Sequence, residues 1–293
     1  MTSSFLTRFA PSPTGHLHIG HAYSAYCAFS AAREAGGECL LRIEDTDQTR
    51  CKPEFEEMIL KDLCWLGYNW PSPVRRQSQH LNAYGEALKI LQDRDLVYRC
   101  FKTRREITDQ IALAPHDAGA GELYGEKPFF GAPLDAREEA GLLEQNKPYA
   151  WRLNMKACKD SLNDDWEKLS FFEEGAGPNG EKGRIKATPE IFGDAILARK
   201  DTGTSYHMAC VHDDGLQGIT HIIRGTDLFA VTHLHVLLQN LLGLNTPIYR
   251  HHPLLTDDAG KRFAKRDQAK TLAAMREEGM IADNVRELMK SYL

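Results

Sequence analysis

The chain has 293 residues, of which 42% are hydrophobic and 26% are charged, and it carries a formal net charge of −5. This length allows one large hydrophobic core or two smaller ones. No run of apolar residues approaches the ~18 that a membrane span requires. Because the net charge is negative, any contact with RNA requires a local basic surface.

The N-terminus and the cysteines indicate the compartment. Residues 1–6 lack the basic segment and the long apolar run of a signal peptide. The seven cysteines are odd in number, scattered and without a C-x-x-C pair, which is typical of reduced thiols rather than of a disulfide framework. We therefore expect a cytoplasmic protein that does not interact with membranes.

The first hundred residues alternate between strand and helix signals. An alanine-rich helical stretch stops at Gly36 and Gly37, and Pro53 stands at the first position of an amphipathic helix. The predicted elements are a strand at 5–9, a helix at 20–35, a strand at 38–43, a helix at 53–66, a helix at 80–94 and a short strand at 96–98. This order predicts a right-handed βαβ unit and a parallel sheet.

The character of the chain changes from about residue 100. Loop-forming residues at 114–121 and 175–180 bracket a mixed region with a strand-like segment at 149–153, so we interpret residues 100–190 as an insertion. The alternating order then resumes with segments at 195–198, 206–211 and 218–224, and with a helix at 229–242.

The turn after the first strand is the most informative segment. Residues 9–21 read Phe-Ala-Pro-Ser-Pro-Thr-Gly-His-Leu-His-Ile-Gly-His. His18 and His21 lie three residues apart at the start of a helix, where backbone amides and imidazoles favour a bound anion. An isolated pair of this kind more often only caps a helix, but the strand and the Pro/Gly-rich turn before it favour a phosphate site. We predict an ATP-using enzyme in which both histidines stabilise the charge of adenylyl transfer.

Three blocks of sequence together resemble a known family. Residues 9–21 resemble the HIGH signature of the class I aminoacyl-tRNA synthetases in their glutamyl branch, residues 42–47 resemble its second block, and residues 218–227 resemble a third. The blocks occur in the order of the family, and the resemblance covers most of residues 1–100 and 190–270. It implies a catalytic domain that activates an amino acid with ATP.

Charges at the predicted strand ends fit a dicarboxylic amino acid. Arg8 and Arg224 lie at or near the ends of apolar strands and suit carboxylates. Glu44, which ends another strand, suits an ammonium group, and the Tyr206 hydroxyl can orient a carboxylate. The resemblance implies glutamate contacts at Arg8, Phe9, Ala10, Pro11, Ser12, Glu44, Tyr206 and Arg224. The alternative is that the arginines form ordinary ion pairs with Asp45 or Asp227, and that Tyr206 is a packed core ring.

A basic segment follows at residues 260–267, with the sequence Gly-Lys-Arg-Phe-Ala-Lys-Arg-Asp. By itself it is typical of a solvated run of surface charge. In context it resembles the KMSKS loop of the family, with Arg262 and Ala264 in place of the first lysine and the serine. The resemblance implies that the catalytic cation, which stabilises charge on the triphosphate, is Lys265 rather than Lys261.

The insertion carries an incomplete metal-binding pattern. Short relatives of this kind often bind zinc through a C-x-C pair, a tyrosine and a last cysteine. Here Cys100 is kept and Tyr124 can correspond to the tyrosine, but Lys102 and Pro128 stand where the other cysteines belong. These groups do not complete a tetrahedral site, so we predict that zinc is absent. Mg²⁺ is expected with ATP, because the triphosphate supplies several of its ligands.

The predicted fold class is α/β, with a Rossmann-type parallel sheet, helices on both faces, a mixed α+β insertion and a short C-terminal helical segment. The predicted domains are the first half of the Rossmann catalytic domain at 1–99, an acceptor-binding-like insertion at 100–190, the second half of the catalytic domain at 191–250, and the KMSKS-like loop with C-terminal helices at 251–293. Helices are expected at 271–278 and from Asp283 onward, which is too little for a further domain.

An enzyme of this branch without an anticodon-reading domain resembles the glutamyl-queuosine tRNA(Asp) synthetases. The resemblance implies activation of L-glutamate by ATP and transfer to queuosine at the wobble position of tRNA(Asp), with the anticodon stem-loop as partner. Neither step requires a protein nucleophile. Three alternatives stay open: a compact glutamyl-tRNA synthetase that charges the 3′ end of tRNA, a catalytically inactive RNA-binding paralogue, and a nucleotidylyltransferase with the same type of fold.

Overall fold

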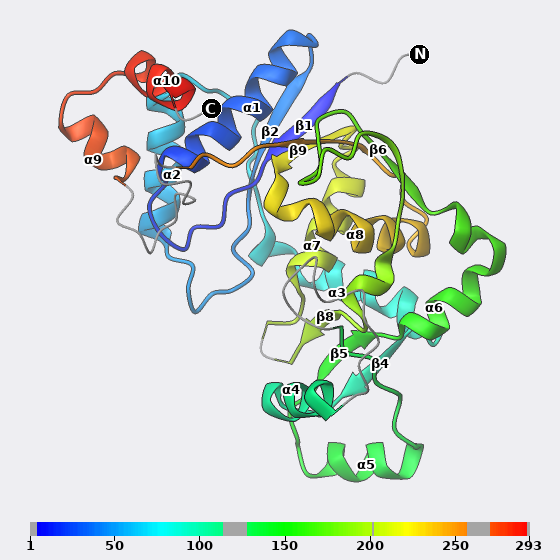
Figure 1. Ribbon diagram of the computed structural model, residues 1–293. Helices are drawn as coiled ribbons and strands as arrows, with labels where there is room; N and C mark the ends of the chain where they lie inside the picture. The colour runs from blue at the N-terminus through cyan, green and yellow to red at the C-terminus, as the bar shows by residue number, and fades with distance from the viewer. Residues whose placement is uncertain (1–4, 114–127, 201, 257–269, 292–293) are drawn as a thin grey trace.

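The computed structural model describes residues 5–113, 128–200, 202–256 and 270–291 (Figure 1). Most of its strands are parallel and form two sheets. In the first sheet the order is β1 (Leu6–Phe9), β2 (Glu38–Ile43) and β3 (Arg75–Arg76). In the second sheet the order is β7 (Gly183–Lys186), β6 (Ser170–Glu173), β10 (Ile248–His252) and β9 (His221–Gly225), and only β7 is antiparallel to its neighbour.

The two sheets meet where β1 lies beside β9. The amide of Thr220 donates to the carbonyl of Leu6 over 2.9 Å, and the amide of Leu6 donates to the Thr220 hydroxyl over 2.8 Å. The strands therefore follow the order β3-β2-β1-β9-β10-β6-β7. The carboxyl ends of β1, β2 and β9 meet at one edge, which is where open α/β sheets bind ligands.

Successive residues of the central strands face two different hydrophobic cores. Leu40 and Ile222 pack in the first core, whereas the residues that follow them, Leu41 and Ile223, pack in the second. The first core contains α3 (Leu81–Gln92), α7 (Tyr206–Leu216) and α8 (Phe229–Leu241), and the second contains α1 (Ile19–Glu34), α2 (Pro53–Trp65), α9 (Leu272–Glu277) and α10 (Ala282–Ser291). Because side chains alternate along a strand, helices cover both faces of the sheet, and the predicted fold class is confirmed.

A smaller antiparallel sheet lies at the far end of the molecule from α9 and α10 (Figure 1). Its strands are β4 (Val97–Cys100), β5 (Ala150–Leu153) and β8 (Ile196–Arg199), in this order. The chain between β4 and β8 also carries α4 (Arg104–Leu113), α5 (Ala136–Glu144) and α6 (Met155–Leu162). Short 3-10 helices complete the described elements, namely η1 (Gln77–His80), η2 (Asn163–Lys168), η3 (Pro189–Phe192) and η4 (Thr226–Leu228). No helix in the described ranges has both the length and the apolar character to cross a bilayer.

Two strands within the predicted insertion at 100–190 belong to the main sheet. β6 pairs in parallel with β10, and β7 pairs with β6. The amide of Glu174, just after β6, donates to the carbonyl of Tyr249 over 2.7 Å. These short strands depend on partners far along the chain, so a local pattern did not reveal them. The domain boundaries stay a prediction, and β4 spans the first of them.

A pair of leucine substitutions tests the packing of α8. Leu234 is fully buried in the first core, whereas Leu216, at the end of α7, is 62% exposed. Leu234→Ala is expected to lower the free energy of unfolding by about 2–5 kcal/mol because it leaves a cavity, and Leu216→Ala to change it by less than about 0.5 kcal/mol. Urea denaturation followed by circular dichroism measures both. Equal losses would contradict the buried position of α8.

Candidate active site

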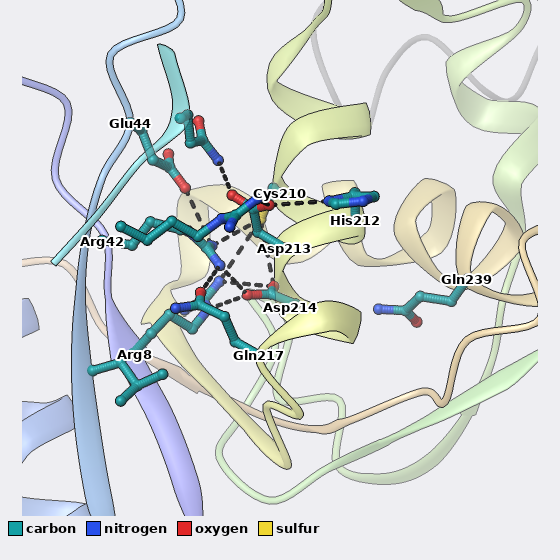
Figure 2. Close-up of polar contacts among 12 residues, drawn as sticks. Arg8, Arg42, Glu44, Cys210, His212, Asp213, Asp214, Gln217 and Gln239 are labelled. Carbon is teal, nitrogen blue, oxygen red and sulfur yellow. Dashed lines mark hydrogen bonds and ion pairs between the residues drawn. The ribbon is translucent and has the colours of Figure 1, made fainter. Parts of the chain in front are cut away.

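A buried carboxylate joins two arginines at the ends of β1 and β2 (Figure 2). Oδ1 of Asp214, on α7, accepts hydrogen bonds from Arg8 Nε over 2.9 Å and from Arg42 Nη1 over 2.8 Å. Arg42 also donates to Glu44 over 3.4 Å and to Gln217 over 3.1 Å. Because unpaired charges are costly in a protein interior, this bridge holds α7 over the strand ends.

The two carboxyl groups of this cluster differ electrostatically. Burial opposes ionisation of Asp214, but the charges of Arg8 and Arg42 outweigh it and lower the pKa of that carboxyl. At Glu44 burial dominates and raises the pKa of the carboxyl, in spite of the opposing charges of Arg42 and Arg8. The protein's own cations therefore do not fully offset the burial of Glu44. A bound ammonium group would stabilise its charged form.

Arg224, near the end of β9, is held by neutral groups. Its Nε donates to His251 Nε2 over 3.1 Å, and its Nη2 donates to Thr232 Oγ1 over 2.7 Å. The guanidinium carbon lies 5.3 Å from the centre of the Tyr249 ring. Nη1 is buried and has no hydrogen-bond partner among the described residues. A buried cationic donor without an acceptor is unfavourable, so this atom suits a ligand carboxylate.

Tyr206 lies within electrostatic range of both Arg8 and Arg224. It is the first residue of α7 and is half-buried. Burial raises the pKa of its hydroxyl, and the charges of Arg224, Glu44 and Arg8 also act on it. The structure thus brings together these four residues, which the sequence analysis proposed as glutamate contacts.

The alternative from the sequence was that the arginines pair with Asp45 or Asp227. An ion pair does form at Arg8, but its carboxylate belongs to Asp214. Arg224 is bonded to a histidine and a threonine instead. The strand-end arginines are therefore held by α7, α8 and β10 rather than by Asp45 or Asp227, in the acidic turns after β2 and β9.

The segment from Phe9 to Ser12 leaves β1 and passes the end of β2. Phe9 packs in the second core, and the carbonyl of Pro11 accepts a hydrogen bond from the amide of Glu44 over 3.1 Å. Ala10 is half-buried and Ser12 is exposed. The backbone of this part of the predicted site therefore lies beside Glu44.

The two histidines at the start of α1 are both hydrogen-bonded through Nδ1. Nδ1 of His18 accepts from the amide of Gly20 over 3.1 Å, and Nδ1 of His21 accepts from the amide of His18 over 3.2 Å. A ring nitrogen that accepts carries no proton, so each neutral ring is protonated on Nε2. The ring centres are 3.9 Å apart. Two rings that each carry a proton on Nε2 therefore lie side by side at a helix N-terminus, where backbone amides favour phosphate oxygens.

The chain returns to this helix start after the basic segment. Thr271 pairs with His18 in an isolated β-bridge. The amide of Leu272 donates to the carbonyl of Leu17 over 2.9 Å. Lys261 and Lys265 lie outside the described residues, so the role of Lys265 stays a prediction.

Comparison with known proteins assigns the family. The model for "tRNA synthetases class I (E and Q), catalytic domain" matches residues 4–117 and 179–290. The chain belongs to this family. It is 44% identical to the glutamyl-Q tRNA(Asp) synthetase of Rhodobacter capsulatus, over 97% of this chain and 99% of that protein. It is 37% identical to the glutamyl-Q tRNA(Asp) synthetase of Geobacter sulfurreducens, over 94% of this chain and 81% of that protein.

A solved class I synthetase shares the fold. The crystal structure of a glutamate tRNA ligase from Elizabethkingia meningosepticum in complex with its amino acid matches with a TM-score of 0.76 and 27% identity. The match covers 98% of this chain and 60% of that one. The Rossmann-type fold and the synthetase family predicted from the sequence are confirmed, and membership of the family implies a ligase that uses ATP.

The residues considered for zinc are only partly described in this synthetase. Cys100 is buried beside Tyr98 and Phe129, and Lys102 Nζ lies 5.9 Å from the centre of the Phe129 ring. Tyr124 is outside the described residues. The described ranges contain no group of three or more His, Cys, Asp or Glu side chains that could hold a metal ion. The absence of zinc stays a prediction.

Sequence reasoning missed Arg42 and Asp214, although both left a signal. Arg42 interrupts the apolar run that follows Glu38 in β2, and its side chain is fully buried. Tyr206, Cys210 and Asp214 are spaced by four residues, which places them on one face of α7. A charged residue in a buried strand and an acidic residue on the same helix face as a predicted ligand contact were the available indications.

Asp213, next to the bridge, attaches α7 to β3 and α3. Its carboxylate forms an ion pair with Arg75 at 2.8 Å and accepts from the Tyr84 hydroxyl over 2.9 Å. Burial by itself would raise the pKa of Asp213, but hydrogen bonds from His212 and Arg75 and nearby cationic charge lower it to about 2. The ionised form of Asp213 therefore stabilises the fold.

The substitution Asp213→Asn tests this contribution. The folded pKa of about 2 lies below the reference value of 3.8, so the stabilisation is complete above about pH 4 and is lost as the pH falls toward 2. Near pH 6 the variant is expected to be less stable by about 2 kcal/mol, and this difference shrinks toward pH 2. Urea unfolding at several pH values measures it. Asp93→Asn, at an exposed carboxylate of an i,i+4 pair, is the control and changes stability by less than about 0.5 kcal/mol. A difference that stays constant with pH would contradict the assignment.

Proposed function

We propose that the protein activates L-glutamate with ATP and transfers the glutamyl group to queuosine at the wobble position of tRNA(Asp). The observation that carries this proposal is the single site that gathers Arg8, Glu44, Tyr206 and Arg224. Cationic and anionic groups side by side suit a zwitterion with two carboxylates. The similarity to glutamyl-Q tRNA(Asp) synthetases supports the choice of acceptor.

In this proposal each group binds one part of glutamate. Arg224 offers Nη1 to a carboxylate, and Arg8 adds a second guanidinium at the end of the neighbouring strand. Glu44 receives the ammonium group, and the Tyr206 hydroxyl orients a carboxylate. The backbone of Phe9–Ser12 lies beside Glu44.

The first step is adenylyl transfer. A carboxylate oxygen of glutamate attacks the α-phosphate of ATP, the bond to the β-phosphate oxygen breaks, and pyrophosphate leaves. The Nε2–H groups of His18 and His21 donate to phosphate oxygens and stabilise the charge that develops there. Lys265 supplies a further cation in this proposal. Mg²⁺ accompanies ATP and takes several of its ligands from the triphosphate.

The second step is acyl transfer to RNA. A hydroxyl of the cyclopentenediol of queuosine attacks the acyl carbon of glutamyl-adenylate, AMP leaves, and the hydroxyl proton is released. The partner is the anticodon stem-loop of tRNA(Asp). Because the leaving group is already activated, the protein acts by positioning and electrostatics rather than as a nucleophile.

A compact glutamyl-tRNA synthetase that charges the 3′ end of tRNA is the alternative. The chain spans 99% of the Rhodobacter capsulatus relative at 44% identity, but only 60% of the glutamate tRNA ligase from Elizabethkingia meningosepticum at 27% identity. The comparisons therefore favour queuosine as the acceptor.

Transfer assays on defined RNAs test the acceptor. ATP and glutamate alone are expected to support pyrophosphate exchange, because activation does not require RNA in this proposal. Labelled glutamate is expected to attach to tRNA(Asp) that carries queuosine, and also to an anticodon stem-loop with queuosine but no 3′ acceptor end. The same RNAs with guanosine at the wobble position are the controls and stay unlabelled. Labelling of the 3′ adenosine, or equal labelling with and without queuosine, would overturn the assignment, and a lack of exchange would indicate an inactive paralogue.

Two arginine substitutions on neighbouring strands test the pocket. Arg224→Ala is expected to reduce kcat/KM for glutamate in pyrophosphate exchange by at least about 100-fold, because a carboxylate loses a charged donor. Binding of ATP stays measurable, since His18 and His21 are unchanged. Arg250→Ala, on β10, removes a half-exposed arginine paired with Glu174 and is expected to leave the exchange unchanged. Persistent activation in Arg224→Ala would show that the carboxylate is bound elsewhere.

A further inference from the structure

A buried chain of hydrogen bonds leads from β6 through β10 to Arg224. Oε2 of Glu173 accepts from His251 Nδ1 over 2.6 Å, and His251 Nε2 accepts from Arg224 Nε over 3.1 Å. Thr232 Oγ1 accepts from Arg224 Nη2 over 2.7 Å and lies 3.4 Å from His251 Nε2. All four side chains are no more than 5% exposed. They come from β6, β10, β9 and α8 and form one closed network.

This network has one consistent placement of protons. Arg224 Nε can only donate, so His251 Nε2 must accept and the ring proton must be on Nδ1. The Glu173 carboxylate can only accept, and it receives that proton in a hydrogen bond. The Thr232 oxygen accepts from Arg224 Nη2, and its 3.4 Å contact with His251 Nε2 is secondary, because the single lone pair of Nε2 already accepts from Arg224 Nε. His251 is therefore a neutral ring whose tautomer is set by Glu173.

Backbone contacts fix Glu173 in turn. Its Oε1 accepts from the amide of His251 over 2.8 Å and from the amide of Gly175 over 2.9 Å. A Cβ at Gly175 would lie 2.3 Å from the carbonyl oxygen of His251, so only glycine allows the chain to approach β10 this closely. With both oxygens engaged, the Glu173 carboxylate has one orientation.

We propose that Glu173, His251 and Thr232 are positioning residues that hold Arg224 for a substrate carboxylate. His251 and Thr232 accept hydrogen bonds from Nε and Nη2 of the guanidinium, so Nη1 is the nitrogen that remains for a ligand. Nη1 is the atom without a partner in the described part of the chain. The identity of the carboxylate, as part of L-glutamate, rests on the proposed function. The arrangement of the hydrogen bonds from Glu173 through His251 to Arg224, here called the relay, does not.

The substitution Glu173→Gln reverses the relay with little change in shape. The amide oxygen is expected to take the place of Oε1, where two backbone amides require an acceptor. The amide NH2 then faces His251 Nδ1 and donates to it, so the ring proton moves to Nε2. Nε2–H and Arg224 Nε–H now face each other as two donors. The KM for glutamate in pyrophosphate exchange is expected to rise at least about tenfold, with an unchanged KM for ATP.

Two readouts separate positioning from a merely structural role. ¹⁵N chemical shifts of the histidine ring, assigned with a His251→Gln variant, report which nitrogen carries the proton. The wild type is expected to show Nδ1–H at His251, and Glu173→Gln to show Nε2–H. Glu174→Gln is the matched control, because this neighbouring carboxylate pairs with Arg250. It is expected to keep the wild-type tautomer and the wild-type KM for glutamate.

The outcomes distinguish this inference from the proposed function. A wild-type His251 protonated on Nε2 overturns the inference, and so does a reversed tautomer with no change in the KM for glutamate. A wild type that shows no exchange with glutamate overturns the proposed function, and the ring tautomers still test the relay.

A second pair of variants tests the inference even if the Glu173→Gln variant does not fold. Thr232→Val removes the acceptor for Arg224 Nη2 at nearly constant volume, and Thr232→Ser keeps it. The valine variant is expected to raise the KM for glutamate several-fold, and the serine variant to keep it near the wild-type value. Equal values for the two variants would overturn the inference.

Discussion

The arrangement of the candidate site depends on one buried carboxylate shared by two guanidinium groups. Asp214 is 2% exposed and pairs with Arg8 from β1 and with Arg42 from β2. Removal of the Asp214 carboxylate would leave two buried guanidinium groups without the anion that they share. This is far more costly than the loss of a surface ion pair. The bridge therefore ties α7 to two strand ends. Because Tyr206 lies on the same face of α7, two turns earlier, its hydroxyl is held within the same cluster of charges.

The order of elements in the catalytic sheet could be predicted because its signals are local. Apolar runs, the Gly36–Gly37 stop and the proline at position 53 indicate strands and helices that the structure contains. Open α/β sheets bind ligands at the carboxyl ends of their parallel strands, and this indicated Arg8, Glu44 and Arg224 as candidate contacts. Their common location in the structure follows from topology that the sequence already indicated, although their roles as ligand contacts stay a proposal.

The remaining parts of the site depend on pairings between distant segments, which local patterns do not report. Asp214 meets Arg42 only after α7 packs over the sheet, and Glu173 meets His251 only because β6 joins β10. β6 was missed because four residues bounded by loops carry little periodicity. The histidine tautomers at the start of α1 required the positions of individual amides, so the sequence indicated two histidines near phosphate but not which nitrogen donates.

The arginines of the site fall into two kinds, and the difference bears on selectivity. Arg8 and Arg42 share Asp214, and Arg42 also contacts Glu44, so two cations meet two carboxylates. In the described part of the chain, the groups that hydrogen-bond to Arg224 are neutral. L-glutamate has two carboxylates and one ammonium group, and its net charge of −1 can balance that remaining cation. L-glutamine has a neutral amide in place of one carboxylate and would leave the cation uncompensated in a buried site. The neutral ring of His251, between Glu173 and Arg224, keeps a protein carboxylate from neutralising that cation directly. In the proposed function, this charge is what discriminates between the two amino acids.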